Sequence, residues 1–174
     1  ENPGRPVIFI GVGFETTTPV VGASIQMAAE QGISNYYVYA AHKSTAPALE
    51  AIANDPETRV DGFILPGHVS TVTGVAPYRF LAETYGIPGV VTGFEPVDVL
   101  NGIARLLVMA DRGEAAIENA YTRGVQADGN PAAQAIIADV FEPCDAVWRG
   151  LGSIPASGMA ISEKYAAHDA TKAF

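Results

Sequence analysis

Four side chains capable of acid–base or metal chemistry follow four apolar segments of the sequence. They are Glu15 in Gly13-Phe14-Glu15-Thr16-Thr17, His42 in His42-Lys43-Ser44-Thr45, His68 in His68-Val69-Ser70-Thr71 and Glu95 in Gly93-Phe94-Glu95-Pro96. Carboxylate and imidazole groups suit iron, zinc or manganese, and they also suit paired acid–base work. Neighbouring strands lie about 4.8 Å apart, so we expect at most two of these groups to meet at one ion. The candidate metal ligands are therefore His42, His68, Glu15 and Glu95, without a defined set.

A glycine-containing turn, Gly11-Val12-Gly13-Phe14-Glu15-Thr16, lies where a dinucleotide-binding fingerprint would lie. Thr16 replaces the third glycine of that fingerprint, and the next strand ends at His42 without an acidic residue for a ribose. Backbone N–H groups and the hydroxyls of residues 16–18 are still suited to holding a phosphate. In the simpler interpretation, these threonines cap a helix that begins at Pro19. Two alternatives stay open: a free-standing metal-dependent enzyme and a phosphate- or nucleotide-binding module.

Short apolar runs alternate with helical stretches along residues 7–113, which is typical of consecutive β-α units. The expected strands are 7–12, 36–41, 60–65 and 89–92, and the expected helices are 19–31, 46–53, 76–85 and 97–112. We predict an α/β fold with a parallel sheet of about four strands, Rossmann-like, in three layers. Because crossovers in such units are right-handed, the strand carboxyl ends share one edge, where ligands bind. In the last helix, Leu100, Ile103, Leu107 and Ala110 are expected to face the sheet.

The C-terminal third departs from this alternation. It predicts helices over 115–121 and 131–141, a strand near 159–161, and an alanine-rich docking arm or tail over 164–174. The predicted organisation is an α/β core domain over 1–113, with the site at the strand C-terminal edge. Residues 114–174 are then a C-terminal helical extension and docking segment of the same domain.

Composition excludes several function classes. The chain has 174 residues and a net charge of −9 with only ten Lys and Arg residues, which argues against nucleic-acid binding. Its single cysteine, Cys144, can form neither an internal disulfide nor a cysteine-only metal site. No apolar run approaches the roughly 18 residues that span a bilayer, so we expect a soluble, cytoplasmic protein. The linker-like opening over residues 1–6 suggests a piece of something longer.

Taken together, these motifs resemble the HypD family of [NiFe]-hydrogenase maturation proteins. The phrases that carry the resemblance run in order across nearly the whole chain: Gly13-Phe14-Glu15-Thr16-Thr17, Pro66-Gly67-His68-Val69-Ser70, Gly93-Phe94-Glu95-Pro96, and Trp148-Arg149-Gly150-Leu151-Gly152 followed by Pro155 and Ser157-Gly158.

The resemblance implies a scaffold that helps assemble the Fe(CN)2CO centre of [NiFe]-hydrogenase, rather than an enzyme acting alone. It implies as partners a small chaperone of the HypC type and a cyanide-delivering protein of the HypE type. The family fold has two similar α/β domains and an iron–sulfur region. This chain looks like the second α/β domain with its following helices, inactive as a fragment.

The sequence departs from the family pattern in its cysteines. The N-terminal cysteine motifs and the C-terminal cluster that would hold a [4Fe-4S] centre are absent, so no cofactor is expected within these residues. Other residues of this chain do match the family's motifs, and the resemblance implies that they form one wall of the iron-assembly cleft. We expect them to bond cyanide ligands, deliver protons or shape the partner interface: Glu15, Thr16, Thr17, His68, Ser70 and Glu95.

Overall fold

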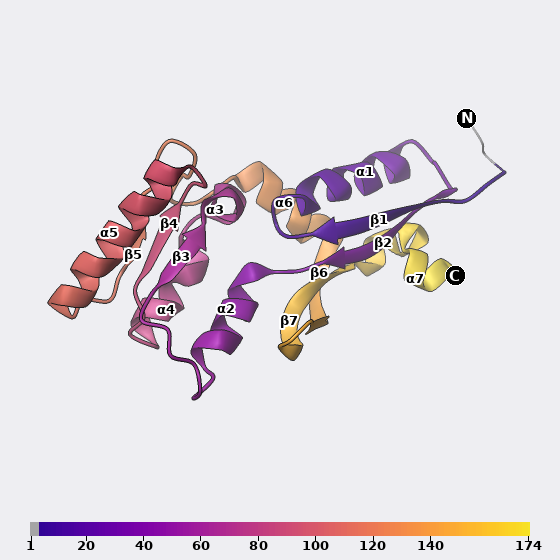
Figure 1. The fold of residues 1–174 in the computed structure, drawn as a ribbon. Helices are drawn as coiled ribbons and strands as arrows, with labels where there is room; N and C mark the ends of the chain where they lie inside the picture. The colour runs from indigo at the N-terminus through magenta and orange to yellow at the C-terminus, as the bar shows by residue number, and fades with distance from the viewer. Residues whose placement is uncertain (1–3) are drawn as a thin grey trace. The chain divides into compact units, whose positions relative to one another are not determined.

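The computed structural model describes residues 4–174, which form an α/β fold of parallel β-α units with an added antiparallel hairpin (Figure 1). The chain divides into two compact units. The first takes the described residues up to Thr45 together with Ala132–Phe174, and the second takes Ala46–Pro131. Residues 1–3 of the expected N-terminal linker lie outside the described residues.

The first unit is built on two parallel strands, β1 (Val7–Gly13) and β2 (Tyr36–His42), joined by helix α1 (Thr18–Glu30). Pro19 lies in the first turn of α1, where its missing N–H costs nothing. After the helix the chain reverses at Gly32, whose φ of 66° favours glycine. The register runs from Val7 opposite Tyr36 to Gly13 opposite His42.

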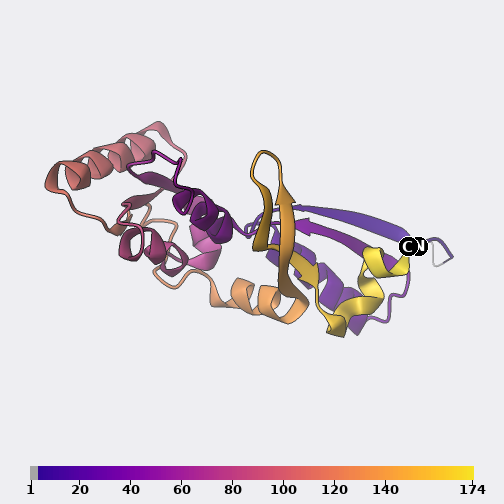
Figure 2. The ribbon, with the colours of Figure 1, turned by 90° about the horizontal axis from the view of Figure 1, so that it is seen from below.

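The C-terminal part of this unit adds an antiparallel hairpin and short helices. In chain order the elements are α6 (Pro131–Val140), β6 (Phe141–Trp148), β7 (Gly152–Ile161), the 3-10 helix η2 (Glu163–His168) and α7 (Ala170–Ala173). Figure 2 shows the long hairpin and, beside it, β1 and β2 running side by side. The core draws on α1, β2 and this C-terminal part: Val21, Ile25, Val38, Val140, Phe141, Met159, Ile161 and Tyr165.

Asp139 on α6 holds three elements of the first unit together. Its carboxylate accepts hydrogen bonds from Gln26 Nε2 on α1 at 2.8 Å, from Lys164 Nζ at 2.5 Å and from Tyr165 OH at 2.6 Å. These bonds, with that of Lys164 the largest contribution, hold the pKa of Asp139 well below its usual range. The junction therefore depends on an ionised carboxylate.

The second unit is a three-stranded parallel sheet in the order β3 (Phe63–Pro66), β4 (Gly89–Thr92), β5 (Ile117–Asn119). Its helices are α2 (Thr45–Ala53), whose first residue still belongs to the first unit, α3 (Gly67–Thr73), the 3-10 helix η1 (Ala76–Tyr78), α4 (Arg79–Glu83) and α5 (Pro96–Arg112). The helix α5 is the crossover from β4 to β5. The buried core residues of the second unit are Leu65, Tyr78, Leu81, Val91 and Val125.

The α/β class and its construction from parallel β-α units are confirmed. The parallel strands are distributed over two sheets, one of two strands and one of three. The helix expected over 115–121 is wrong, because residues 117–119 pair with β4 as a strand. The helix expected over 76–85 is two short pieces, η1 and α4, and α3 precedes them. The strand expected near 159–161 belongs to the longer β7, which pairs with β6.

The expected apolar face of α5 is also wrong. The helix buries Asp98, Gly102 and Met109, whereas Leu100 and Leu107 are each 65 % exposed. The cause is a close approach at Gly102, where an added Cβ would lie 2.4 Å from Thr92 Cγ2 of β4. Because Gly102 has no side chain, the backbone of α5 packs directly against β4. This contact determines which face of α5 is buried.

No helix among residues 4–174 has both the length and the apolar character needed to cross a membrane.

The close approach at Gly102 predicts that Gly102→Ala destabilises the protein. In a free helix alanine is favoured over glycine by about 1 kcal/mol, but here the new methyl group meets Thr92. We expect the free energy of unfolding to fall by about 1–3 kcal/mol, measured by urea denaturation.

Thr92→Ser removes the methyl group that the new Cβ would meet, and it serves as the matched partner. In the Thr92→Ser background, Gly102→Ala should lower the free energy of unfolding by less than half of what it costs in the wild type. A stabilising Gly102→Ala, or an equal cost in both backgrounds, would contradict the close-packing explanation.

Candidate functional site

The structure divides the residues predicted for the site between the two units. Glu15, Thr16, Thr17 and His42 belong to the first unit, and His68, Ser70 and Glu95 belong to the second. Each group is built within its own unit, at the carboxyl ends of parallel strands.

Glu15 lies buried in the turn between β1 and α1, and both oxygens of its carboxylate are occupied. Oε1 accepts the backbone N–H of Thr45 at 2.7 Å, and Oε2 accepts the Thr45 hydroxyl at 2.9 Å. A buried carboxylate is costly unless it is bonded, and charge-assisted bonds of this kind are strong. Within the first unit, Glu15 is thus held inward by Thr45, three residues after the end of β2.

The threonines after Glu15 do not cap α1 in the expected way. Thr17 occupies the N-cap position, but its side chain makes no capping hydrogen bond. The hydroxyls of Thr17 and Thr18 instead donate to the carbonyl of Phe14, at 3.3 and 2.9 Å. Thr16 is exposed. These bonds tighten the turn, and Thr16 is left facing solvent.

Glycine is required at Gly13 for this turn to close. A Cβ there would lie 2.2 Å from Thr17 Oγ1, and the φ of 152° lies in a region that other residues rarely adopt. The Gly-Phe-Glu-Thr-Thr phrase therefore encodes the geometry of the turn as well as its polar groups.

His42 ends β2 and is 2 % exposed. Among the described residues, neither ring nitrogen has a hydrogen-bond partner. The ring lies over Gly11, where an added Cβ would come within 2.7 Å of Cε1, and its centroid is 5.9 Å from that of Phe141. Burial lowers the pKa of His42. His42 is therefore an enclosed, neutral imidazole in the first unit.

An aromatic cluster lies close to the end of β1. The rings of Phe14 and Trp148 are 6.0 Å apart, and Lys43 Nζ lies 4.8 Å from the Trp148 ring while donating to the carbonyl of Val147. Trp148 Nε1 donates to Ser157 Oγ at 2.8 Å. The sequence motifs that contain Trp148 and Ser157 thus meet across the β6–β7 hairpin, a pairing that sequence reasoning did not predict.

His68 occupies the first turn of α3 and is exposed. Its ring lies edge-on to Phe94, with centroids 4.6 Å apart, and 6.2 Å from the ring of Tyr121. The preceding Gly67 is needed because a Cβ would lie 2.1 Å from the carbonyl oxygen of Thr92. Ser70 is buried, and its hydroxyl donates to the carbonyl of Pro66 at 3.0 Å. The histidine is presented to solvent, whereas the serine closes the helix turn.

Glu95 is joined to Asp98 through Arg123, a residue that sequence reasoning missed. Arg123 donates to both Asp98 oxygens, at 2.7 and 2.5 Å, and to Glu95 Oε2 at 2.7 Å. Its guanidinium also lies 4.7 Å from the Tyr121 ring. The hydrogen bond from Arg123 lowers the pKa of Asp98, and the same bond raises the pKa of Arg123. Nothing local in the sequence around Arg123 points to this role.

Within the described part of the chain, no three His, Cys, Asp or Glu side chains gather as a metal-binding group. A [4Fe-4S] cluster requires cysteine thiolates, and this chain has only Cys144. That thiol is partly buried in β6, and burial together with Asp145 raises its pKa. The residues present therefore do not fit an iron–sulfur cluster.

The fold and these strand-end groups define an α/β protein with polar motifs at the carboxyl ends of its parallel strands. Comparison with known proteins then identifies the family. All of residues 1–174 match HypD, described as the hydrogenase formation hypA family. The chain therefore belongs to the HypD family.

Curated relatives match along the whole chain. Hydrogenase maturation factor HypD of Rhodobacter capsulatus is 50 % identical over 175 residues, covering 100 % of this chain and 46 % of the relative. HypD of Escherichia coli is 41 % identical over 177 residues, covering 100 % and 47 %. A putative hydrogenase expression/formation protein of Methanocaldococcus jannaschii is 43 % identical over 165 residues, covering 95 % and 46 %. The chain thus spans about half the length of the curated relatives it matches.

The enclosed His42 predicts a specific pH dependence of stability. Because its pKa is lowered in the folded state from 6.5, the unfolded state binds the proton more readily. Stability should therefore fall as pH drops below 6.5, with a slope of at most about 1.4 kcal/mol per pH unit from this group. The measurement is urea unfolding at pH 7.5 and 5.5 for the wild type and His42→Leu.

The leucine variant should lose this part of the acid sensitivity. A His68→Leu variant, which removes an exposed histidine, should retain it. An identical pH dependence in the wild type and His42→Leu would show that the His42 ring titrates as it would in solvent.

Proposed function

We propose that this chain is the central α/β part of a HypD-type maturation scaffold. In this role it helps assemble the Fe(CN)2CO centre of [NiFe]-hydrogenase and forms one wall of the cleft in which iron, the substrate, is assembled. The observation that carries the proposal is the match to the family across all 174 residues, with relatives named as hydrogenase maturation factors. The proposed partners are a HypC-type small chaperone and a HypE-type cyanide-delivering protein.

The exposed groups of the second unit are suited to this chemistry. A cyanide ligand accepts hydrogen bonds through its nitrogen, and two N–H donors, His68 and Arg123, each lie near the Tyr121 ring. Glu95 and Asp98 hold the guanidinium in place. We assign to His68 and Glu95 the roles of bonding cyanide and moving protons at the developing iron centre.

Thr16 and Thr17 of the first unit are both exposed, but the Thr17 hydroxyl is bonded to the carbonyl of Phe14. Thr16 is available to contact a ligand or partner, while Glu15 and Thr17 shape the turn that presents it. Ser70 has the same positioning role in the second unit. The iron–sulfur cluster expected for the complete protein would need thiolates from outside this chain, so we expect the isolated 174 residues to be inactive.

A chimera tests the proposal. The chain replaces the matching segment of the Rhodobacter capsulatus HypD in a strain that lacks its own copy, and hydrogenase activity is measured. We expect the chimera to restore activity, and His68→Phe and Glu95→Gln to reduce it by about tenfold or more. Because both side chains are exposed, the melting temperatures of the two chimera variants should differ little from that of the unsubstituted chimera. His68→Phe keeps an aromatic ring against Phe94 and removes only the nitrogens.

Glu163→Gln is the matched control for Glu95→Gln. Both glutamates are highly exposed and each pairs with one basic side chain, Lys172 in the case of Glu163. The control should keep full activity. A folded chimera that restores nothing, or full activity in both His68→Phe and Glu95→Gln, would contradict the proposed role.

A further inference from the structure

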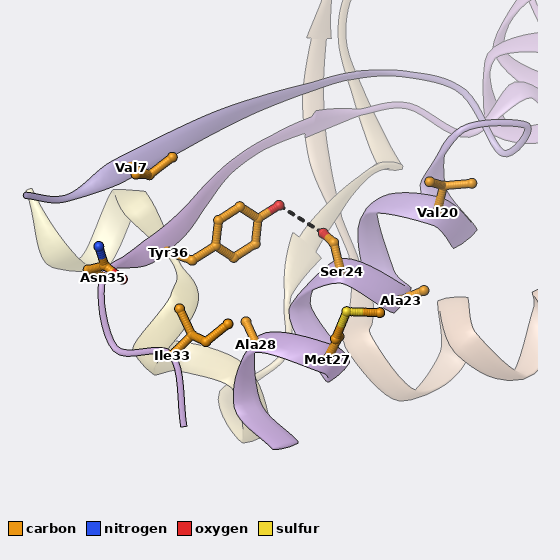
Figure 3. A pocket seen from close by; sticks show the side chains of 9 residues that line it. All are labelled: Val7, Val20, Ala23, Ser24, Met27, Ala28, Ile33, Asn35 and Tyr36. Atoms are coloured by element: carbon orange, nitrogen blue, oxygen red, sulfur yellow. Dashed lines mark hydrogen bonds between the residues drawn. The ribbon is translucent and has the colours of Figure 1, made fainter. Parts of the chain in front are cut away.

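The hollow that Figure 3 shows is an apolar feature of the first unit. It has a volume of about 620 Å³ and lies between α1 and the beginnings of β1 and β2. None of the nine side chains that line it is charged, and Tyr36 and Ser24 on its wall bond each other at 2.8 Å. This hollow therefore offers a ligand no charged group, in contrast to the strand ends of the second unit.

The turn that follows β5, residues 120–125, is a third strand end of the second unit. Asn119 fixes its shape, because Oδ1 accepts the backbone N–H of Tyr121 at 2.9 Å and Nδ2 donates to the carbonyl of Val125 at 3.0 Å. The backbone N–H groups of Gly124 and Val125 both donate to the carbonyl of Tyr121. Since β5 pairs with β4 in parallel, this turn leaves the sheet at the same edge as the motifs after β3 and β4.

The ring of Tyr121 occupies space that three glycines leave free. A Cβ added at Gly67 would lie 2.8 Å from the ring, and one at Gly93 would also lie 2.8 Å from it. At Gly124 the distance would be 2.7 Å. Gly67 and Gly93 are the first residues after β3 and β4. One aromatic ring therefore sets how closely both strand-end motifs approach the turn after β5.

Arg123, from the same turn, connects this ring to two carboxylates. Its guanidinium lies 4.7 Å from the centre of the Tyr121 ring. Asp98 is buried, and its two oxygens accept from Nη1 and Nη2 of Arg123 at 2.7 and 2.5 Å. Nη2 also donates to Glu95 Oε2 at 2.7 Å. The planar guanidinium suits this arrangement, because its donors are fixed relative to one another.

The exposed Glu95 is thereby restrained by a partner that is itself fixed. The Glu95 side chain is 76 % exposed, and an exposed glutamate ordinarily samples many rotamers. A surface ion pair alone orders such a side chain little. Here the buried Asp98 and the Tyr121 ring hold Arg123 in one place. The same ring lies 6.2 Å from that of His68, so both exposed site residues are placed against one fixed structure.

We propose that Tyr121 and Arg123 are the positioning residues of the candidate site in the second unit. Arg123, held by Asp98, orients the carboxylate of Glu95, and the Tyr121 ring sets the place of His68. This inference rests on the proposed function, because Arg123 and Tyr121 act here through Glu95 and His68.

The first test measures the order of the Arg123 side chain rather than activity. In the 174-residue chain, the heteronuclear NOE at Arg123 Nε should match that of backbone amides in β4, and Asp98→Asn should lower it to about half or less. Arg105 is the matched control, since it bonds the partly exposed Glu118 and has similar exposure to Arg123. Its NOE should be lower in the wild type and unchanged in Asp98→Asn. An Arg123 side chain as mobile as that of Arg105 would overturn the proposal.

The second test is a double-mutant cycle in the chimera with Rhodobacter capsulatus HypD. Arg123→Gln should reduce hydrogenase activity by about tenfold, as Glu95→Gln does. The double variant should lose no more than about twofold beyond Glu95→Gln alone, because a residue that acts through Glu95 then has nothing to position. Arg105→Gln should keep full activity. Adding Asp98→Asn to Arg123→Gln removes the unpaired buried charge, so this pair should fold and show the same loss.

Tyr121 is tested in the same way against His68. Tyr121→Phe keeps the ring and should keep activity, whereas Tyr121→Leu should reduce it by about tenfold. In the His68→Phe background, Tyr121→Leu should cost no more than about twofold further. Equal losses in both backgrounds would show that the ring supports the fold alone.

The outcomes separate this proposal from the proposed function. Full activity in both His68→Phe and Glu95→Gln would contradict the proposed function itself. Lost activity in Glu95→Gln with full activity in Arg123→Gln, or losses that multiply in the double variant, would overturn the positioning role alone. The NOE measurement needs no maturation activity, so it decides whether Arg123 is fixed even when the chimera restores nothing.

Discussion

The buried carboxylate of Glu15 is the interaction on which the first strand-end motif depends. The ladder of β1 and β2 places Gly13 opposite His42, so the chain leaves both strands at the same edge of the sheet. A few residues beyond, Glu15 turns inward and accepts both the N–H and the hydroxyl of Thr45. Without these donors a buried carboxylate would cost several kcal/mol. These bonds therefore tie the turn after β1 to Thr45, the segment that follows β2 in the same unit, and they fix how Thr16 is presented.

The strand-end groups separate into two kinds when their surroundings are considered. Glu15, His42 and Ser70 are buried, and their side chains are bonded or enclosed by the unit that carries them. His68, Glu95 and Thr16 are exposed. Under the proposed role, the buried side chains stabilise the turns after the strands, and the exposed side chains contact the iron centre or a partner protein. A repeated motif at strand ends is thus explained by positioning as much as by chemistry.

Local patterns predicted the β-α alternation and the placement of polar groups after strands, because apolar runs and glycine–proline punctuation are local signals. They did not predict the inward face of α5. Periodicity identifies an apolar stripe, but the missing side chain at Gly102 decides which face meets β4. The three-residue strand β5 was also missed, since it exists only through pairing with β4. The contacts of Thr45 with Glu15 and of Arg123 with Glu95 join residues roughly thirty positions apart, beyond the reach of spacing rules.

Amide hydrogen exchange at Thr45, followed by NMR, tests the central claim that the Glu15 carboxylate is a fixed internal anchor. In the wild-type chain the Thr45 amide should exchange slowly, as amides of the β1–β2 ladder do. In Glu15→Ala it should exchange about tenfold faster or more, while the amide of Tyr39, which faces β1 in the ladder, keeps its protection. A Thr45 amide that exchanges freely in the wild type, or whose protection is unchanged in Glu15→Ala, would contradict the account.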